Sequence, residues 1–220
     1  QEVAFQAVDY ILRVLKKNMV FGMTWGRAMH EFVEQLAKDE RLRSLSFQNV
    51  KVVPFLGTPG AIQSDSWNTT TYSNTLATKV GNLLHCASYN LSAPMYVEGT
   101  KEKELIESID EIAKVLHMAE TADIALIGIG SMQDDSSIIK AEIRTKEEYK
   151  ELVRKGAVGE IVGRIYDKNG QTVDEDLKRK MVGISLDKIA KIPVRVGMSY
   201  GKDKIEAIKG AIAGGLVNVL

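Results

Sequence analysis

The chain has 220 residues, of which 45% are hydrophobic and 26% are charged. This is the composition of an ordinary soluble globular protein, and it excludes disordered and collagen-like chains. The 29 acidic and 29 basic side chains cancel, so the chain lacks the positive excess that contact with a phosphate backbone needs, and we expect that it does not bind DNA by itself.

The sequence predicts a cytoplasmic protein without a cofactor. Its single cysteine, Cys86, excludes an intrachain disulfide, and the three histidines form no spaced cluster of metal ligands. No run approaches the roughly 18 apolar residues of a membrane span, and the N-terminal segment carries acids, unlike a signal peptide. Because the sequence begins at Gln1 without a methionine, it reads as part of a longer protein.

The first half of the chain is expected to alternate helices with buried strands. Apolar residues at helical spacing indicate helices, and continuous apolar runs indicate strands that are buried on both faces. Gly26 is expected to turn the chain from the first strand into the next helix. The expected elements are a helix at 3–15, a strand at 19–25, a helix at 27–36, a strand at 51–56, a loop at 57–68 and a helix at 73–84.

The second half continues the alternation and adds one hairpin. The pair Asn169-Gly170 is a strong turn signal between β-rich runs, so it predicts the hairpin turn. The expected elements are an extended segment at 87–97, a helix at 101–119, a strand at 122–130, a helix at 146–154, the hairpin at 160–173, a strand at 194–200, a helix at 202–213 and a strand at 216–220.

Four strand-to-helix units in succession predict an α/β fold, a Rossmann-like and mostly parallel sheet with helices on both faces. The chain has no internal repeat, low-complexity tract or linker. We therefore expect residues 1–220 to form a single domain.

Small-residue loops follow the predicted strands, where open α/β sheets bind their ligands and helix N-termini offer backbone N–H groups to anions. Each loop alone is more often plain turn chemistry, but four at one sheet edge favour a site for an anionic small molecule. The loops are TWGRA (24–28), GTPG (57–60), GIGSM (128–132) and SYGKDK (199–204).

Two charged residues near these loops are candidates for ligand binding. Lys204 is expected near the start of a helix, where a cation is unfavourable unless an anion lies beside it; the alternative is a solvated surface lysine. Glu160 could accept hydrogen bonds from sugar hydroxyls, although without other information a strand-end carboxylate facing water is the favoured interpretation.

Other familiar chemistry is missing or has a simpler explanation. Thr71, Ser73 or Asn74 could serve as the N-cap of the helix that follows, and capping is the default interpretation there. The nucleophile elbow GxSxG, the Walker motif and GxGxxG are all absent.

The ordered set of segments resembles the effector-binding domain of the SorC family of bacterial transcriptional regulators. The most specific piece is GAVGEIVGRIYDKNG, followed after a short interval by VGISLDKIAKIP. The other segments that carry the resemblance are GMTWGRAM, KVVPFLGTPG, NLSAPMYVE, ADIALIGIGSM and GKDKIEAIKGAIAGGLVNVL. The resemblance implies a relative of the ribose-phosphate isomerase, glucosamine-phosphate deaminase and CoA transferase fold. It also implies that the domain senses a phosphorylated sugar and controls an attached helix-turn-helix region, which would precede Gln1.

The resemblance also implies a set of effector-binding residues. Gly26 and Arg27 match the turn that lines the ligand phosphate, and Lys204 matches a lysine that meets a phosphate. Glu160 takes a place usually held by aspartate or glutamate. The remaining matches are Gly57 and Thr58 at the family's glycine pair, Tyr72 and Asn74 near the ligand, and Gly130 and Ser131 in the third loop.

One departure from the family pattern narrows the range of ligands that the site is expected to bind. Some relatives carry lysine or arginine just ahead of the glycine pair, where it can form a Schiff base or hold a second phosphate. Here that position is Leu56, so a covalently bound aldehyde sugar and a bisphosphate both become less favoured.

Two functions remain open at this point. The leading hypothesis is a non-catalytic sensor, a homo-oligomer whose DNA contacts come only from the preceding region, and in which a monophosphorylated sugar or sugar alcohol shifts the oligomeric arrangement. The alternative is a sugar-phosphate isomerase or deaminase, with Glu160 as base and Lys204 stabilising an enediolate. Fold alone does not decide between them.

Overall fold

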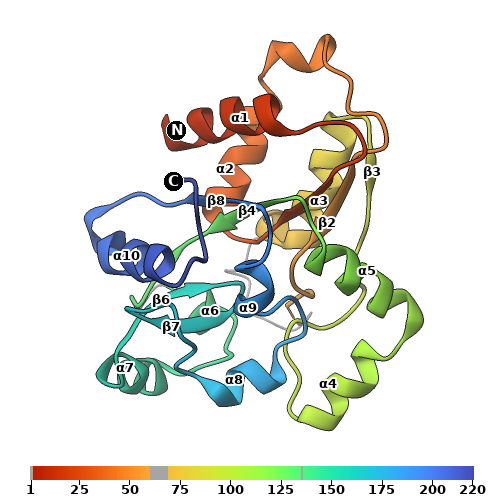
Figure 1. Ribbon diagram of the computed structural model, residues 1–220. Coiled ribbons are helices and arrows are strands. Elements are labelled where there is room, and N and C mark those ends of the chain that lie inside the picture. The colour runs from red at the N-terminus through yellow and green to blue at the C-terminus, as the bar shows by residue number, and fades with distance from the viewer. Residues whose placement is uncertain (1, 60–68, 135) are drawn as a thin grey trace.

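A computed structural model describes residues 2–59, 69–134 and 136–220. A five-stranded, wholly parallel sheet forms the centre of the molecule, with the strand order β3-β2-β1-β4-β8 (Figure 1). This confirms the predicted α/β fold. The strands are β1 (Val20–Met23), β2 (Lys51–Pro54), β3 (Ala87–Ser88), β4 (Ile124–Gly128) and β8 (Val194–Met198).

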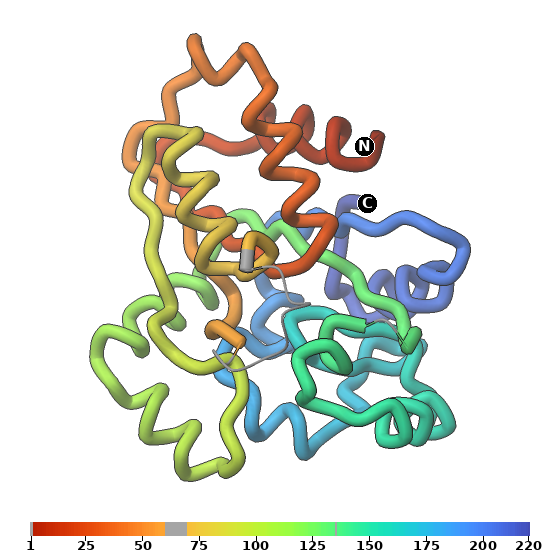
Figure 2. The backbone as a smooth tube through the Cα atoms, turned by 180° about the vertical axis from the view of Figure 1, so that it is seen from behind, coloured from red at the N-terminus to blue at the C-terminus, as the bar shows by residue number. Residues whose placement is uncertain are grey.

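Helices cover both faces of this sheet. Alternate residues of a strand point to opposite sides, so apolar strands present an apolar surface on each face that helices can bury. Phe21, Met23 and Leu126 join one core cluster, whereas Val53 and Ile127 join the other. Figure 2, a view from behind, shows α2 and α3 on the near side of the sheet. The first cluster contains α1 (Glu2–Val14), α2 (Arg27–Leu36) and α3 (Ser73–Leu83), and the second contains residues of α5 (Asp110–Glu120), α9 (Leu186–Ile189) and α10 (Ile205–Ala213).

A second, antiparallel sheet of three strands, which the sequence did not predict, lies in the lower half of Figure 1. Its strand order is β5-β6-β7, and α7 and α10 pack against β6. Its strands are β5 (Gly130–Ser131), β6 (Ala157–Ile161) and β7 (Arg164–Asp167), and α7 spans Lys146–Arg154.

The predicted hairpin exists, but its main turn lies elsewhere. β6 and β7 are joined by Val162 and Gly163, whose φ angles of 53° and 69° give the doubly positive turn that suits a two-residue hairpin loop. Asn169-Gly170 makes a further turn after β7, where the Asp167 amide donates to the Gln171 carbonyl. The Asn-Gly pair therefore predicted the turn after β7 correctly but gave no indication of the Val162-Gly163 turn between β6 and β7.

The predicted helix at 101–119 is wrong as a single helix. The chain forms α4 (Thr100–Glu107) and α5, and between them Ile109 has an extended ψ of 123° as the N-cap residue of α5. Leu105 and Ile109, which a single helix would place on one apolar stripe, are 70% and 50% exposed. The acidic pair Asp110 and Glu111 in the first turn of α5 favours a new helix start there.

The segment 87–97, expected to be extended, forms strand β3 at Ala87 and Ser88 and isolated bridges at Pro94 and Tyr96. The strand expected at 216–220 pairs only at Val219, in an isolated bridge with Val196. The other short elements are η1 (Glu40–Arg43), η2 (Thr69–Thr71), α6 (Ser137–Lys140), α8 (Glu175–Lys180) and η3 (Lys202–Lys204).

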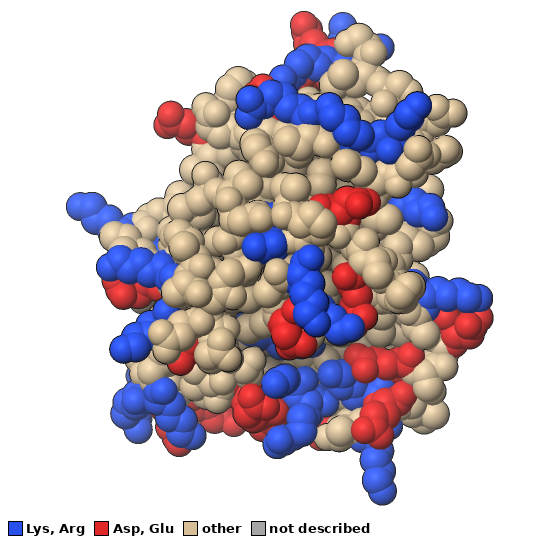
Figure 3. Space-filling view, viewed as in Figure 1, with Lys and Arg blue, Asp and Glu red and all other residues tan. Residues whose placement is uncertain are grey.

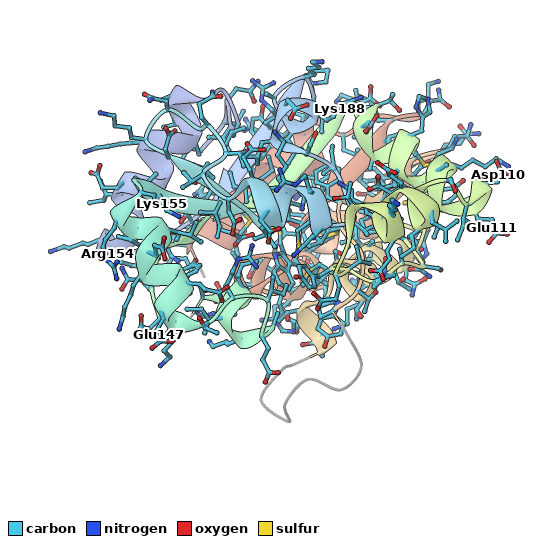
Figure 4. The ribbon with its side chains drawn as sticks, turned by 90° about the horizontal axis from the view of Figure 1, so that it is seen from below. Asp110, Glu111, Glu147, Arg154, Lys155 and Lys188 are labelled. Carbon is cyan, nitrogen blue, oxygen red and sulfur yellow. The ribbon has the colours of Figure 1, made fainter. Side chains whose placement is uncertain are left out.

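Charged side chains of both signs are interspersed over the face seen in Figure 3. Seen from below, Glu147 and Arg154 on α7, Lys155 directly after it, and Asp110 and Glu111 on α5 point away from the body (Figure 4). Within the three described ranges, no helix has the length and apolar character to span a membrane.

Candidate functional site

A cavity of about 260 Å³ lies at the carboxyl ends of β1, β4 and β8. β2 follows β1 on one side of the sheet, whereas β4 and β8 lie on the other, so the cavity sits at the point where the strand order reverses. Ligands of open α/β sheets bind at such a point. The lining residues are Trp25, Gly26, Arg27, Ala28, Gly128, Ile129, Gly130, Ser137, Glu160, Met198, Ser199, Tyr200, Asp203 and Lys204.

The β1–α2 junction provides the first wall. Gly26 has φ 104° and ψ 179°, a conformation almost restricted to glycine, and its amide donates to the Thr71 carbonyl. As a glycine at the N-cap, it leaves the first N–H groups of α2 without a side-chain cap, and the first turn of α2 contains no acidic residue. Arg27 follows directly and lines the cavity, so this wall favours an anion.

The β8–α10 junction provides the opposite wall. Lys204 is the N-cap residue of α10 and makes no side-chain capping bond to it. Its ammonium lies 3.7 Å from the Asp203 carboxylate, and its side chain is 23% exposed. The Tyr200 hydroxyl donates to Glu31 of α2 over 3.4 Å, which links the two walls.

Glu160 reaches the cavity from β6, the middle strand of the small sheet. It pairs with Gly130 of β5, and a Cβ atom at Gly130 would lie 2.8 Å from the Glu160 Oε2 atom, so a glycine is needed opposite this carboxyl group. The Gly163 amide donates to Oε1, and the Trp25 side chain is also hydrogen bonded to Glu160. The hairpin turn and the first loop therefore hold the carboxyl group in place.

The environment of Glu160 contradicts the expected water-facing carboxylate, because the residue is only 6% exposed. Burial raises the pKa of Glu160 to about 6, while the bonds from Gly163 and Trp25 and the charges of Lys204 and Arg164 act in the opposite direction. Near neutral pH the group is a buried acceptor that a ligand hydroxyl can reach from the cavity.

Five of the ten predicted site residues line this one cavity: Gly26, Arg27, Gly130, Glu160 and Lys204. Ser131 lies next to it, and its hydroxyl donates to Asp203 Oδ2 over 3.0 Å. The first, third and fourth small-residue loops therefore meet as expected.

The second loop does not line this cavity over its described part, and Gly60 lies outside the described residues. The Gly57 amide donates to the Val182 carbonyl, and a Cβ atom at Gly57 would lie 2.5 Å from the Ala93 carbonyl oxygen. Thr58 lines a separate polar hollow of about 550 Å³. Gly57 is thus packed closely against neighbouring backbone, whereas Thr58 faces the separate hollow.

The expected caps of α3 have other roles. Tyr72 is the N-cap residue and makes no side-chain capping bond to the helix. The Ser73 hydroxyl donates to the Leu56 carbonyl over 2.8 Å. The Asn74 amide donates to Thr58 and to the Leu91 carbonyl and accepts from the Leu91 amide, so Asn74 ties α3 to two loops. Asn74 also lines the hollow of Thr58 rather than the main cavity.

Ser137 and Met198 line the cavity but lie outside the four small-residue loops, whereas Trp25, Tyr200 and Asp203 are among the lining residues inside those loops to which the sequence assigned no role. In the first, third and fourth of these loops the family resemblance assigned roles only to Gly26, Arg27, Gly130, Ser131 and Lys204. An aromatic or acidic residue inside a small-residue loop was the available signal. As for metals, no three His, Cys, Asp or Glu side chains in the described parts of the chain gather into a metal-ligand set.

Comparison with known proteins identifies the family. The Sugar-bind family model, which describes a sugar-binding domain, matches residues 1–220. The chain belongs to this family. Relatives include the transcriptional regulator LsrR of Klebsiella pneumoniae subsp. pneumoniae, 31% identical over 97% of this chain and 62% of the relative, and the sorbitol operon regulator of Klebsiella pneumoniae, 28% identical over 94% and 63%.

The solved structures agree with the fold. The full-length sorbitol operon regulator SorC from Klebsiella pneumoniae matches with a TM-score of 0.86 and 25% identity, over 99% of this chain and 68% of that chain. The resemblance to the SorC family is therefore confirmed. The present chain spans just over three fifths of the curated relatives' length, and those relatives are transcriptional regulators.

Proposed function

We propose that this domain is the effector sensor of a transcriptional regulator and that its effector is a phosphorylated sugar or sugar alcohol. The observation that carries the proposal is the composition of one cavity: two helix N-termini, Arg27 and Lys204 can meet a phosphate, and the buried Glu160 can accept from a hydroxyl. Phosphate suits helix N-termini and cations, and a carboxylate suits a sugar hydroxyl.

The proposal includes what the rest of the regulator does. A helix-turn-helix region attached to this domain would make the DNA contacts, and the domain would act as a homo-oligomer, since paired DNA half-sites need paired readers. An effector can shift such an assembly only by as much as it binds one arrangement better than the other. We propose no turnover, because the relatives are regulators.

Calorimetric titration with a panel of sugar monophosphates and their unphosphorylated parents tests the proposal. A charge-assisted hydrogen bond to phosphate contributes about 1.5 to 3 kcal/mol, so Lys204→Ala should weaken binding of the phosphorylated sugar about ten- to hundredfold. The matched control is Lys202→Ala, an exposed lysine two residues earlier that does not line the cavity.

Three results would count against the proposal. Equal losses in the two variants would make Lys204 a general surface charge, and no loss would remove it from the site. Failure of every sugar phosphate to bind the wild-type domain would reject a phosphorylated effector. A bound effector at a hundred times its dissociation constant should raise the free energy of unfolding by about 2.7 kcal/mol, which thermal shift can follow.

A further inference from the structure

An acidic side chain stands in the cavity at the place where the proposed effector would present its own negative charge. Asp203 lines the cavity next to Lys204, and its Oδ2 atom lies 3.7 Å from the Lys204 ammonium. The same oxygen accepts a hydrogen bond of 3.0 Å from the hydroxyl of Ser131, a residue that is 3% exposed. A buried donor therefore orients the Asp203 carboxylate toward the cavity wall.

Asp203 gives Lys204 an anionic partner when no effector is bound. A phosphate that approaches Lys204 therefore meets a carboxylate beside its target. Two like unit charges about 4 Å apart change an equilibrium roughly fivefold even at the dielectric constant of water, and more in a partly enclosed site. The Asp203 side chain is 47% exposed, so the smaller figure applies.

We propose that Asp203 is a specificity-determining residue that competes with the phosphate group of the ligand for Lys204 and so selects against ligands that offer a phosphate alone. A sugar phosphate can offset this competition through its hydroxyls, for which Glu160 is a buried acceptor in the same cavity. Inorganic phosphate has no such contacts and is rejected. The inference rests on the proposed function, because it takes Lys204 as the phosphate contact.

The test is calorimetric titration of inorganic phosphate into the wild-type domain and two variants. Asp203→Asn removes the charge but keeps an oxygen that can accept from Ser131, and it should bind inorganic phosphate about fivefold more tightly. The matched control is Glu206→Gln, which removes one negative charge from the first turn of α10, where Glu206 pairs with Lys209 at 2.8 Å and does not line the cavity. Its affinity for inorganic phosphate should change less than twofold.

The outcomes separate this inference from the function on which it rests. A gain confined to Asp203→Asn supports the inference. Equal gains in both variants, or no gain in Asp203→Asn while sugar phosphates bind the wild type through Lys204, overturn the inference alone. If neither inorganic phosphate nor any sugar phosphate binds the wild type or Asp203→Asn, the proposed function fails and the inference fails with it.

Discussion

Glu160 combines deep burial with an ionisable group, and this gives the protein a pH-dependent contribution to stability. Its carboxyl pKa is raised above the ordinary 4.5 to about 6, mainly by burial. Between these values the folded state holds more protons than the unfolded state, so the free energy of unfolding falls as pH rises through this range. At 1.36 kcal/mol for each pKa unit, the total change is about 2 kcal/mol.

We therefore predict that Glu160→Gln abolishes this contribution. Urea unfolding from pH 4.5 to 7.5 should show the wild type losing about 2 kcal/mol relative to the variant. Glu107, whose pKa is also raised by burial, is present in both proteins and cancels in the difference. Glu206→Gln, on an exposed side of α10, should run parallel to the wild type. Parallel profiles for Glu160→Gln would mean that the pKa of the Glu160 carboxyl group is not raised in the folded state.

At the residue scale, the sequence located two charged residues of the site but did not predict how buried they are or which residues they contact. The family resemblance pointed to Glu160 and Lys204, and both line the cavity. The burial of Glu160 was not predicted because it depends on two partners that the sequence did not place beside it. Trp25 lies far away in the sequence, and Gly163 belongs to a turn that was predicted at Asn169-Gly170 instead. Asp203 was missed because its partner Ser131 is 72 residues away.

The junction of β1 and α2 depends on the conformation of one glycine. Gly26 and Gly156 both have positive φ, 104° and 96°, and a Cβ atom at either position would meet no atom within 4 Å. Backbone strain of this kind costs about 1 to 3 kcal/mol, so Gly26→Ala and Gly156→Ala should destabilise the domain by similar amounts. Gly26 lines the cavity and Gly156, after α7, does not.

The two glycine variants should therefore differ in binding. We predict that Gly26→Ala weakens sugar-phosphate binding at least tenfold, because the first N–H groups of α2 must shift to relieve the strain, whereas Gly156→Ala keeps wild-type affinity. Denaturation and titration of both variants measure the two quantities separately. Wild-type affinity in Gly26→Ala, or equal weakening in both, would show that the α2 N-terminus does not contact the ligand.

At the element scale, sequence patterns predicted the structure correctly where that structure depends on a single continuous segment. The helices at 27–36 and 146–154 were predicted with the bounds that the structure has, since apolar periodicity marks them clearly. In the segment 101–119 the apolar periodicity continues through the break between α4 and α5, so periodicity alone did not distinguish two helices from one. The small sheet was missed because β5 has two residues and pairs with a strand almost thirty positions later.

At the scale of the whole molecule, the alternation of strands and helices was enough to predict the parallel sheet, because connections between parallel strands follow few rules. The strand order was not predicted, since it depends on which face each helix covers. That order places the cavity between β1 and β4. It explains why three small-residue loops lie around the cavity, whereas the second, after β2, is turned toward Ala93 and Val182.

The charge of the whole molecule leads to the last prediction, that this domain alone does not bind DNA specifically. Its 29 basic and 29 acidic residues balance, and both signs mix over the face in Figure 3. Affinity for duplex DNA comes largely from counterions released when basic residues contact phosphates, and specific complexes reach about 10⁻⁸ to 10⁻¹¹ M. Anisotropy of a labelled operator duplex at physiological salt should show binding weaker than about 10⁻⁴ M, the weak end of nonspecific binding. A sequence-specific complex that survives excess competitor DNA would contradict the prediction and would place a DNA-reading surface on this domain.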